Sequence, residues 1–251
     1  MPIVLAALDN SLAVNPVLVM ARALARLLGA RVEAIHVLGE GVEAAEGAAR
    51  AAGVPLRLSS GPVVERLVGA GQAADVAAMA IGARGTTIGS DHALGSTALA
   101  VVTSLRVPVV VVPPAAEVAP RLHRVLVPLE GTTSSSLAPR SIVELASGAE
   151  VDVIVLHVND VAEDDEGWTR EFLARYCPWG IGVVRLERRE GRREEVVPRV
   201  AEELQSDLIV FGWEQQLSEG RAPVVGAALE SSKIPVMLIP VTVGGGDNEP
   251  A

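Results

Sequence analysis

The chain has 251 residues, of which 49% are hydrophobic but only 2% aromatic, and its formal net charge is −10. The acidic balance argues against a general nucleic-acid-binding or anionic-membrane-binding protein, because both need surfaces rich in Lys and Arg. The aliphatic composition favours an α/β protein in which buried parallel strands lie under helices.

Cysteine usage and hydropathy limit the location of the protein. Cys177 is the only cysteine, which excludes an intramolecular disulfide and fits a reducing cytoplasm. The N-terminus lacks the basic start and apolar core of a secretory signal, and no run approaches the roughly 18 apolar residues of a membrane span. We therefore expect a soluble cytoplasmic protein.

The first half alternates apolar runs with amphipathic segments. Residues 3–8 predict a buried strand that ends at Asp9. In the helix that follows, Asn15 is a favoured N-cap, Pro16 a favoured first helical residue, and Gly29 supplies the stop. An Ala/Glu stretch at 42–52 is left without an assignment. Beyond the first strand we expect a helix at 62–73, a second helix before the last strand, and strands at 32–38, 54–58, 75–81 and 108–112.

The second half repeats this order, with strands predicted at 125–129, 151–158, 180–186, 207–211 and 235–239 and a helix at 192–205. Asp9 and Glu130 end the first strand of each half, and His36 and His157 lie in the second strands. Each pair is 121 positions apart. This shared spacing indicates internal duplication. No acidic or histidine ligand pattern surrounds the two histidines, so we expect both to be structural.

Composition also marks the segments between and after the halves. Residues 113–120 carry three prolines and no helical periodicity, which predicts a linker. The Gly-rich, acidic tail is expected to be disordered. Arg188, Arg189, Arg192 and Arg193 alternate with glutamates and predict a solvated face of salt bridges. The expected organisation is a first domain at 1–113, a linker at 114–123, a second domain at 124–243 and a tail at 244–251.

Strands that alternate with helices predict a parallel sheet with right-handed crossovers and helices on both faces. We expect two tandem Rossmann-like domains, each with a five-stranded sheet of order 3-2-1-4-5. Ligands in such sheets bind beyond the carboxyl ends of the strands, where the order reverses, here between strands one and four. Asp9 and Gly82 end those two strands and should face each other across a crevice.

The most informative motif begins at Gly82. Gly82 and Gly85 are followed by nine residues and then by Gly95 and Ser96. Glycines give backbone amides close access to an anion, and a helix that begins here would direct its free amides to the same point. The pattern predicts a phosphate site; glycines that only turn the chain are the alternative.

Together these features resemble the universal stress protein family in its tandem form. The resemblance rests on the strand that ends at Asp9, on His36-Val37, and on the glycine pattern, which is the family's signature for members that bind ATP. It covers about residues 3–113 and 124–241. It implies an adenine nucleotide alpha hydrolase-like fold in each half and a regulatory, ATP-binding role in the stress response.

The resemblance also implies where ATP lies. Asp9 and Val37 would contact the nucleoside, Val37 through its backbone, and amides of Gly85, Gly95 and Ser96 would donate to phosphate. Arg84 is the only cation in the loop and Asp91 opposes it, so Mg2+ or Mn2+ is expected with the triphosphate. No protein metal site is assigned. The expected nucleotide-binding residues are Ala7, Asp9, Val37, Ile81, Gly82, Arg84, Gly85, Gly95, Ser96 and Thr97.

The second half departs from the pattern. Glu130 replaces the aspartate, Gln215 stands in place of the second glycine, and Gly226-Ala227 arrive one residue late without a hydroxyl. Glu130 and Glu214 would repel polyphosphate. We therefore expect this half to bind ATP poorly and to pair with the first as an intramolecular pseudo-dimer, because the last strands, 109–112 and 236–239, would otherwise leave sticky edges. A further homodimer and an unidentified protein partner are left open.

Other function classes lack their motifs. A P-loop needs a lysine in GxxxxGK[ST], and no such motif surrounds Lys233, the only lysine. A dinucleotide-dependent oxidoreductase needs GxGxxG after the first strand, and residues 9–15 contain no glycine. Ser96 with His92 is the only local nucleophile and base, without a GxSxG elbow. The alternatives are slow ATP hydrolysis, with Asp9 or Asp91 as the base, and an interaction module that binds no nucleotide.

Overall fold

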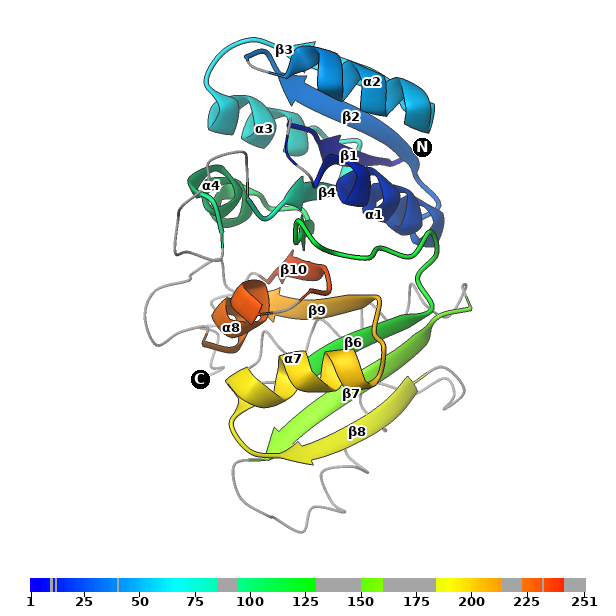
Figure 1. The fold of residues 1–251 in the computed structure, drawn as a ribbon, viewed down its shortest axis with the longest axis vertical. Helices are drawn as coiled ribbons and strands as arrows, with labels where there is room; N and C mark the ends of the chain where they lie inside the picture. The colour runs from blue at the N-terminus through cyan, green and yellow to red at the C-terminus, as the bar shows by residue number, and fades with distance from the viewer. Residues whose placement is uncertain are drawn as a thin grey trace, which may run out of the picture.

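The computed structural model describes residues 1–9, 11, 13–39, 41–84, 94–129, 150–159, 184–213, 223–231 and 233–241. Within them, ten strands form one mixed sheet of order β3-β2-β1-β4-β5-β10-β9-β6-β7-β8 (Figure 1). The expected order 3-2-1-4-5 is confirmed in each half. The two five-stranded sheets are joined into one, because the fifth strands of the two halves pair with each other.

The elements follow the predicted alternation of strands and helices. The first half contains β1 (Ile3–Ala7), α1 (Val14–Leu27), β2 (Arg31–Val37), α2 (Val42–Ala52), β3 (Leu56–Ser59), α3 (Val63–Gly71), β4 (Val76–Gly82), α4 (Ser96–Ser104) and β5 (Val109–Val112). The second half contains β6 (Arg124–Leu129), β7 (Asp152–Asn159), β8 (Val184–Glu190), α7 (Arg193–Glu203), β9 (Leu208–Trp213), α8 (Pro223–Ser231) and β10 (Val236–Pro240).

Helix α1 begins earlier than predicted. Its N-cap is Ala13, so Asn15 and Pro16 lie in the first turn rather than at the N-cap and first position. The N-cap makes no side-chain hydrogen bond, and before it the Ser11 Oγ accepts the Ala13 N–H at 3.2 Å and the Ser11 carbonyl accepts the Val14 N–H at 3.3 Å. The predicted stop is confirmed, because Gly29 follows the helix with φ +58°.

Alternate residues of each strand point into two apolar cores, one on each face of the sheet. On one face, Val4 and Ala6 of β1 pack with buried residues of α1 and α2. On the other, Ile3 and Leu5 belong to a cluster that also includes buried residues of α3, α4, α7 and α8. Helices therefore cover both faces of the first half, as predicted, and the second cluster runs through both halves.

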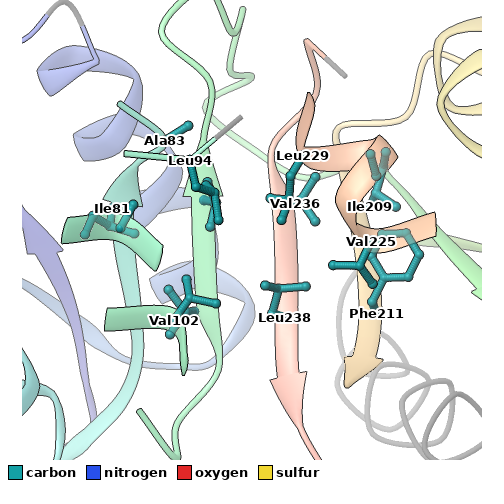
Figure 2. Packing of buried hydrophobic residues seen from close by; sticks show 14 of the residues in the cluster. Ile81, Ala83, Leu94, Val102, Ile209, Phe211, Val225, Leu229, Val236 and Leu238 are labelled. Atoms are coloured by element: carbon teal, nitrogen blue, oxygen red, sulfur yellow. The ribbon is translucent and has the colours of Figure 1, made fainter. Parts of the chain in front are cut away.

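The two halves meet where β5 pairs antiparallel with β10, with Val110 opposite Met237 and Val111 opposite Val236. Figure 2 shows how the apolar cluster continues across this seam: Leu94 and Val102 lie on the side of the first half, and Leu229, Val236 and Leu238 lie on the side of the second. The sticky edges predicted for the two last strands are thus buried against each other, as in a pseudo-dimer.

The connection between the halves is packed against them. Residues 113–123 contain no helix or strand, but Ala116 and Leu122 are buried in the core beneath α1. Arg26 of α1 donates to the Pro120 carbonyl at 2.6 Å. At the start of β6, Asp207 Oδ2 accepts the Arg124 N–H at 2.8 Å. These two bonds hold the C-terminal end of the connection, and Ala116 is buried nearer its start. The predicted tail at 244–251 lies outside the described residues.

Candidate functional site

The predicted crevice lies at the carboxyl ends of β1 and β4. The two strands pair in parallel with Ala7 opposite Ile81, so Asp9 and Gly82 follow neighbouring strand ends. A Cβ built on Gly82 would lie 3.1 Å from the Ala13 Cβ and 4.0 Å from the Ser11 Oγ. The segment after β1 therefore lies directly over Gly82. This close approach gives a packing reason for a glycine here, beside the anion-binding reason that the sequence suggested.

A turn after β1 fixes the carboxylate of Asp9. Its Oδ1 accepts the Ser11 N–H at 2.8 Å, and the Ser11 Oγ in turn accepts the Ala13 N–H. Since a hydroxyl that accepts one bond keeps its own hydrogen, Ser11 can still donate to a ligand in the crevice. Ser11 was not predicted as a site residue. The spacing of Asp and Ser before a helix, typical of such side-chain turns, was the available signal.

The start of α4 is tied to the end of β4. Gly95 is the N-cap, with φ −64° and ψ 154°, and its N–H donates to the Ala83 carbonyl at 2.9 Å. The expectation that the Gly95 amide serves phosphate is therefore corrected: this donor is already engaged within the protein. The amides of Ser96 and Thr97 lie in the first turn, where an N–H has no partner within the helix. Ser96 is exposed and Thr97 half-buried.

The end of β2 presents backbone to the same crevice. The Ile35 carbonyl accepts the Leu8 N–H at 2.9 Å, so it faces β1. Carbonyls two residues apart in a strand face the same side. The Val37 carbonyl therefore also faces β1, just beyond Leu8. His36 fixes this arrangement, because its side chain is buried and its Nδ1 donates to the Leu8 carbonyl at 2.9 Å.

The other predicted residues differ in burial, and some lie outside the described part of the chain. Ala7, Val37 and Ile81 are at most 9% exposed, and their side chains belong to the apolar core beneath the ends of β1, β2 and β4. Arg84 is exposed at the end of the described loop. Gly85, Asp91 and His92 lie outside the described residues. The structure therefore brings together the backbone at the ends of β1, β2 and β4 and the start of α4.

The second half differs most at the counterpart of α4. Its α8 begins at Pro223, 127 positions after Ser96, the same spacing that separates the starts of β5 and β10. Gly226 lies inside α8, so its assignment as the counterpart of Gly95 was wrong. Pro223 stands in the place of Ser96 and has neither the hydroxyl nor the N–H. Glu130, Glu214 and Gln215 lie outside the described residues.

The predicted salt-bridge face is present along β8 and α7. Glu187 pairs with Arg189 and, at 3.0 Å, with Arg185. Arg192 lies 3.2 Å from both Glu194 and Glu195. The backbone N–H of Glu194 and the Arg192 guanidinium hold the pKa of the Glu194 carboxyl below its ordinary value. These exposed charges pair with one another and do not form a cationic surface.

Two negative findings concern the part of the chain that the structure describes. It contains no group of three His, Cys, Asp or Glu side chains that could hold a metal ion. None of its helices combines the length and the apolar character that crossing a membrane requires.

Comparison with known proteins gives a family and a fold. Residues 121–240 match the model of the universal stress protein family. The match falls on the half in which the glycine pattern is altered, so by itself it does not address nucleotide binding. No curated protein is a detectable sequence relative of the chain.

Solved structures match the whole chain. A universal stress protein from Archaeoglobus fulgidus DSM 4304 is similar over 96% of this chain and 97% of its own, with 17% identity and a TM-score of 0.71. A putative universal stress protein from Pseudomonas aeruginosa UCBPP-PA14 is similar over 95% and 92%, with 15% identity and a TM-score of 0.62. A family protein from Arabidopsis thaliana, solved with AMP bound, covers 48% of this chain and 93% of its own, with 17% identity and a TM-score of 0.37.

Proposed function

Because the chain belongs to the universal stress protein family, through the match of residues 121–240, we propose that it is a regulatory stress-response protein that binds ATP in its first half. One observation carries the proposal. In the first half, the Asp9–Ser11 turn and the end of β4 at Gly82 meet at the switch point of the sheet. Such a position is where open α/β sheets bind their ligands.

The groups at the crevice suit a nucleoside triphosphate. The first-turn amides of Ser96 and Thr97 can donate to phosphate oxygens, and the helix dipole adds about 0.3 to 1 kcal/mol for an anion there. The hydroxyls of both residues and the exposed Arg84 supply further donors. At the other end, Asp9 and the Val37 backbone would receive the nucleoside. The phosphates and the base would therefore contact different groups of the protein, on the two sides of β1.

A divalent cation fits this donor set. Mg2+ prefers oxygen ligands and is usually held by one or two carboxylates together with substrate phosphates, not by an all-protein cage. The Ser96 and Thr97 hydroxyls are oxygen ligands among the described residues that would share Mg2+ or Mn2+ with the phosphates. The cation would offset the charge of the triphosphate, which Arg84 alone does not balance.

The second half has a structural task in this proposal. With domains at 1–113 and 124–243 joined by 114–123, the second domain covers the β5 edge and completes the apolar cluster beside α4. An exposed strand of four valines would be a site of aggregation. The second domain therefore stabilises the domain that binds ATP, and we expect one nucleotide per chain.

A second candidate function is an interaction module that binds no nucleotide. It is favoured by the structural roles of two motif glycines: Gly82 makes room for Ala13, and the Gly95 N–H bonds the Ala83 carbonyl. Under this reading the glycines serve packing and turning alone. ATP titration separates the two candidates.

The test is calorimetric titration of the full chain with ATP and Mg2+, repeated with Gly95→Asp. Gly95 has backbone angles that any residue adopts, and aspartate is a favoured N-cap, so this variant keeps or raises the melting temperature. Its carboxylate would lie where phosphate binds. We expect ATP affinity to fall by at least about tenfold, whereas the matched N-cap variant Gly95→Ser stays within about threefold. No heat from the unsubstituted protein at millimolar ATP contradicts the proposal, and unchanged affinity in Gly95→Asp places the site elsewhere.

A further inference from the structure

Helices α3 and α7, one in each half, are entered through the same backbone conformation. Gly61 and Gly191 have φ of +124° and +120°. The N-caps that follow, Pro62 and Arg192, have φ of −61° and −70° with ψ of 126° and 124°. Helices α3 and α7 then begin at residues 63 and 193, which are 130 positions apart, as the two glycines are. Val63 and Arg193 therefore occupy equivalent places in the two halves.

In the second half this place holds a side chain that reaches the sheet. The Arg193 Nε–H donates to the Val158 carbonyl at 3.3 Å, and the arginine is half-buried. Val158 is the counterpart of Val37: each follows the histidine of the second strand, and the two lie 121 positions apart. The Val158 carbonyl, the counterpart of the Val37 carbonyl, is thus bonded by an N–H donor of the protein itself.

Among the described residues of the first half, position 63 places no such donor beside the equivalent carbonyl. Val63 carries no donor and its side chain is 45% exposed. A Cβ built on Gly39 meets, among the described residues, only the Val37 carbonyl oxygen within 4 Å, at 3.9 Å. The space beside this oxygen is therefore open on the side of Gly39. Leu38, 47% exposed, adds a second apolar side chain at the same strand end.

We propose that residue 63 and its counterpart 193 decide which half receives the base of the nucleotide, an inference that rests on the function proposed above. In the first half, the Val37 carbonyl accepts the amino group of adenine, and Val63 leaves room for the ring. In the second half, the guanidinium of Arg193 takes the place of that amino group, since both are planar N–H donors.

The blocking of the Val158 carbonyl by Arg193 is separate from the loss of the phosphate site. Pro223 removes a donor at the phosphate end of the second half, whereas Arg193 acts at the base end, from a different helix. A base that entered the second half would have to break the bond between the half-buried Arg193 and the Val158 carbonyl. The second half is therefore closed to a nucleoside as well as to a polyphosphate.

The test transfers the arginine to the first half. Val63→Arg copies residue 193 onto an exposed position, and the matched control Pro62→Arg copies Arg192 onto the adjacent N-cap, which adds the same charge without a side chain at position 63. Both variants and the unsubstituted protein are titrated with ATP and Mg2+ and with inorganic triphosphate, after thermal melts confirm folding.

We expect Val63→Arg to lower ATP affinity by at least about tenfold while Pro62→Arg stays within about threefold, because only an arginine at position 63 occupies the place from which Arg193 reaches its carbonyl. Affinity for inorganic triphosphate should change equally in the two arginine variants. If the unsubstituted protein binds ATP and Val63→Arg binds it as well, the inference is overturned and the proposed function stands. If the unsubstituted protein does not bind ATP, both are overturned.

Discussion

The two halves share a backbone frame and differ in a few side chains at the strand ends. Both have the strand order 3-2-1-4-5, a glycine with φ near +120° before α3 or α7, and a histidine one residue before an equivalent valine. They differ where a ligand would bind: Ser96 corresponds to Pro223, and Val63 to Arg193. Core and turn positions set the backbone and are kept in both halves, whereas positions at the crevice have changed without cost to the fold.

The inner and outer edges of the sheet make a second contrast. The inner edges, β5 and β10, carry apolar residues and pair with each other. Of the outer edges, β3 has four residues and β8 carries a run of Arg and Glu. Short or charged edge strands resist pairing with other chains. The chain therefore uses one edge of each half for assembly and blunts the other.

The largest effect is expected from breaking the inner edge. Val110 is 0% exposed and lies opposite Met237. Val110→Asp would bury a carboxylate without a partner, and we expect the free energy of unfolding to fall by at least about 4 kcal/mol. Urea unfolding followed by circular dichroism measures this. The control, Leu58→Asp on the outer strand β3, is 46% exposed and should cost less than about 1 kcal/mol. Equal costs would show that the seam is not the more sensitive edge.

A smaller change in the free energy of unfolding is expected at a position where α3 and α7 pack differently. A Cβ built on Gly71 of α3 lies 2.8 Å from one Leu105 methyl carbon and 2.9 Å from the Met79 Cε. Its counterpart in α7, 130 positions later, is Ala201, which is 0% exposed. In the first half, Leu105 and Met79 thus occupy the space that the Ala201 methyl group takes in the second half.

We expect Gly71→Ala to lower the free energy of unfolding by about 1–3 kcal/mol through overpacking. In the same helix, a Cβ built on Gly69 meets no heavy atom of the described residues within 4 Å, so Gly69→Ala should raise stability by about 0.5–1 kcal/mol. Urea unfolding of both variants gives the sign directly. A gain in stability for Gly71→Ala would mean that the neighbouring side chains move aside at little cost.

The sequence was sufficient for elements with a buried, periodic pattern and insufficient for exposed ones. Most strands were predicted within two residues because their aliphatic runs are buried. The strand predicted at 180–186 lies at 184–190, and residues 180–183 lie outside the described part. Its charged side chains at a sheet edge carry no apolar signal. Helix α2 went unassigned because its Ala/Glu stretch buries only Ala45 and Ala49.

For the candidate site, topology was predictable and hydrogen bonding was not. The strand order placed the Asp9 and Gly82 strand ends side by side from pattern alone. That the Gly95 N–H donates to the Ala83 carbonyl, and that the Ser11 Oγ accepts the Ala13 N–H before α1, depends on how the loops fold back onto the strands. The counterpart of Gly95 was misassigned because loop lengths differ between the halves, and only the helix start at Pro223 fixes the alignment.

The smallest predicted effect concerns a charge that only the second half has. The backbone N–H of Glu194 and then Arg192 hold the pKa of Glu194 below its ordinary value of 4.5. The counterpart of Glu194, 130 positions earlier, is Val64, which cannot titrate. Since the folded pKa is lowered, the ionised carboxylate stabilises the fold above pH 4.5, and this contribution is lost as the pH falls through the lowered value.

We expect Arg192→Gln to raise the pKa of Glu194 only part of the way to its ordinary value, because the backbone bond is the larger cause and is left in place. Carboxyl-carbon NMR titration of Glu194 measures the shift. Arg199→Gln, which removes a more distant guanidinium paired at 3.8 Å with Glu203, should leave that pKa unchanged. An identical titration curve in Arg192→Gln would assign the whole effect to the helix start and remove the salt bridge from the list of differences between the halves.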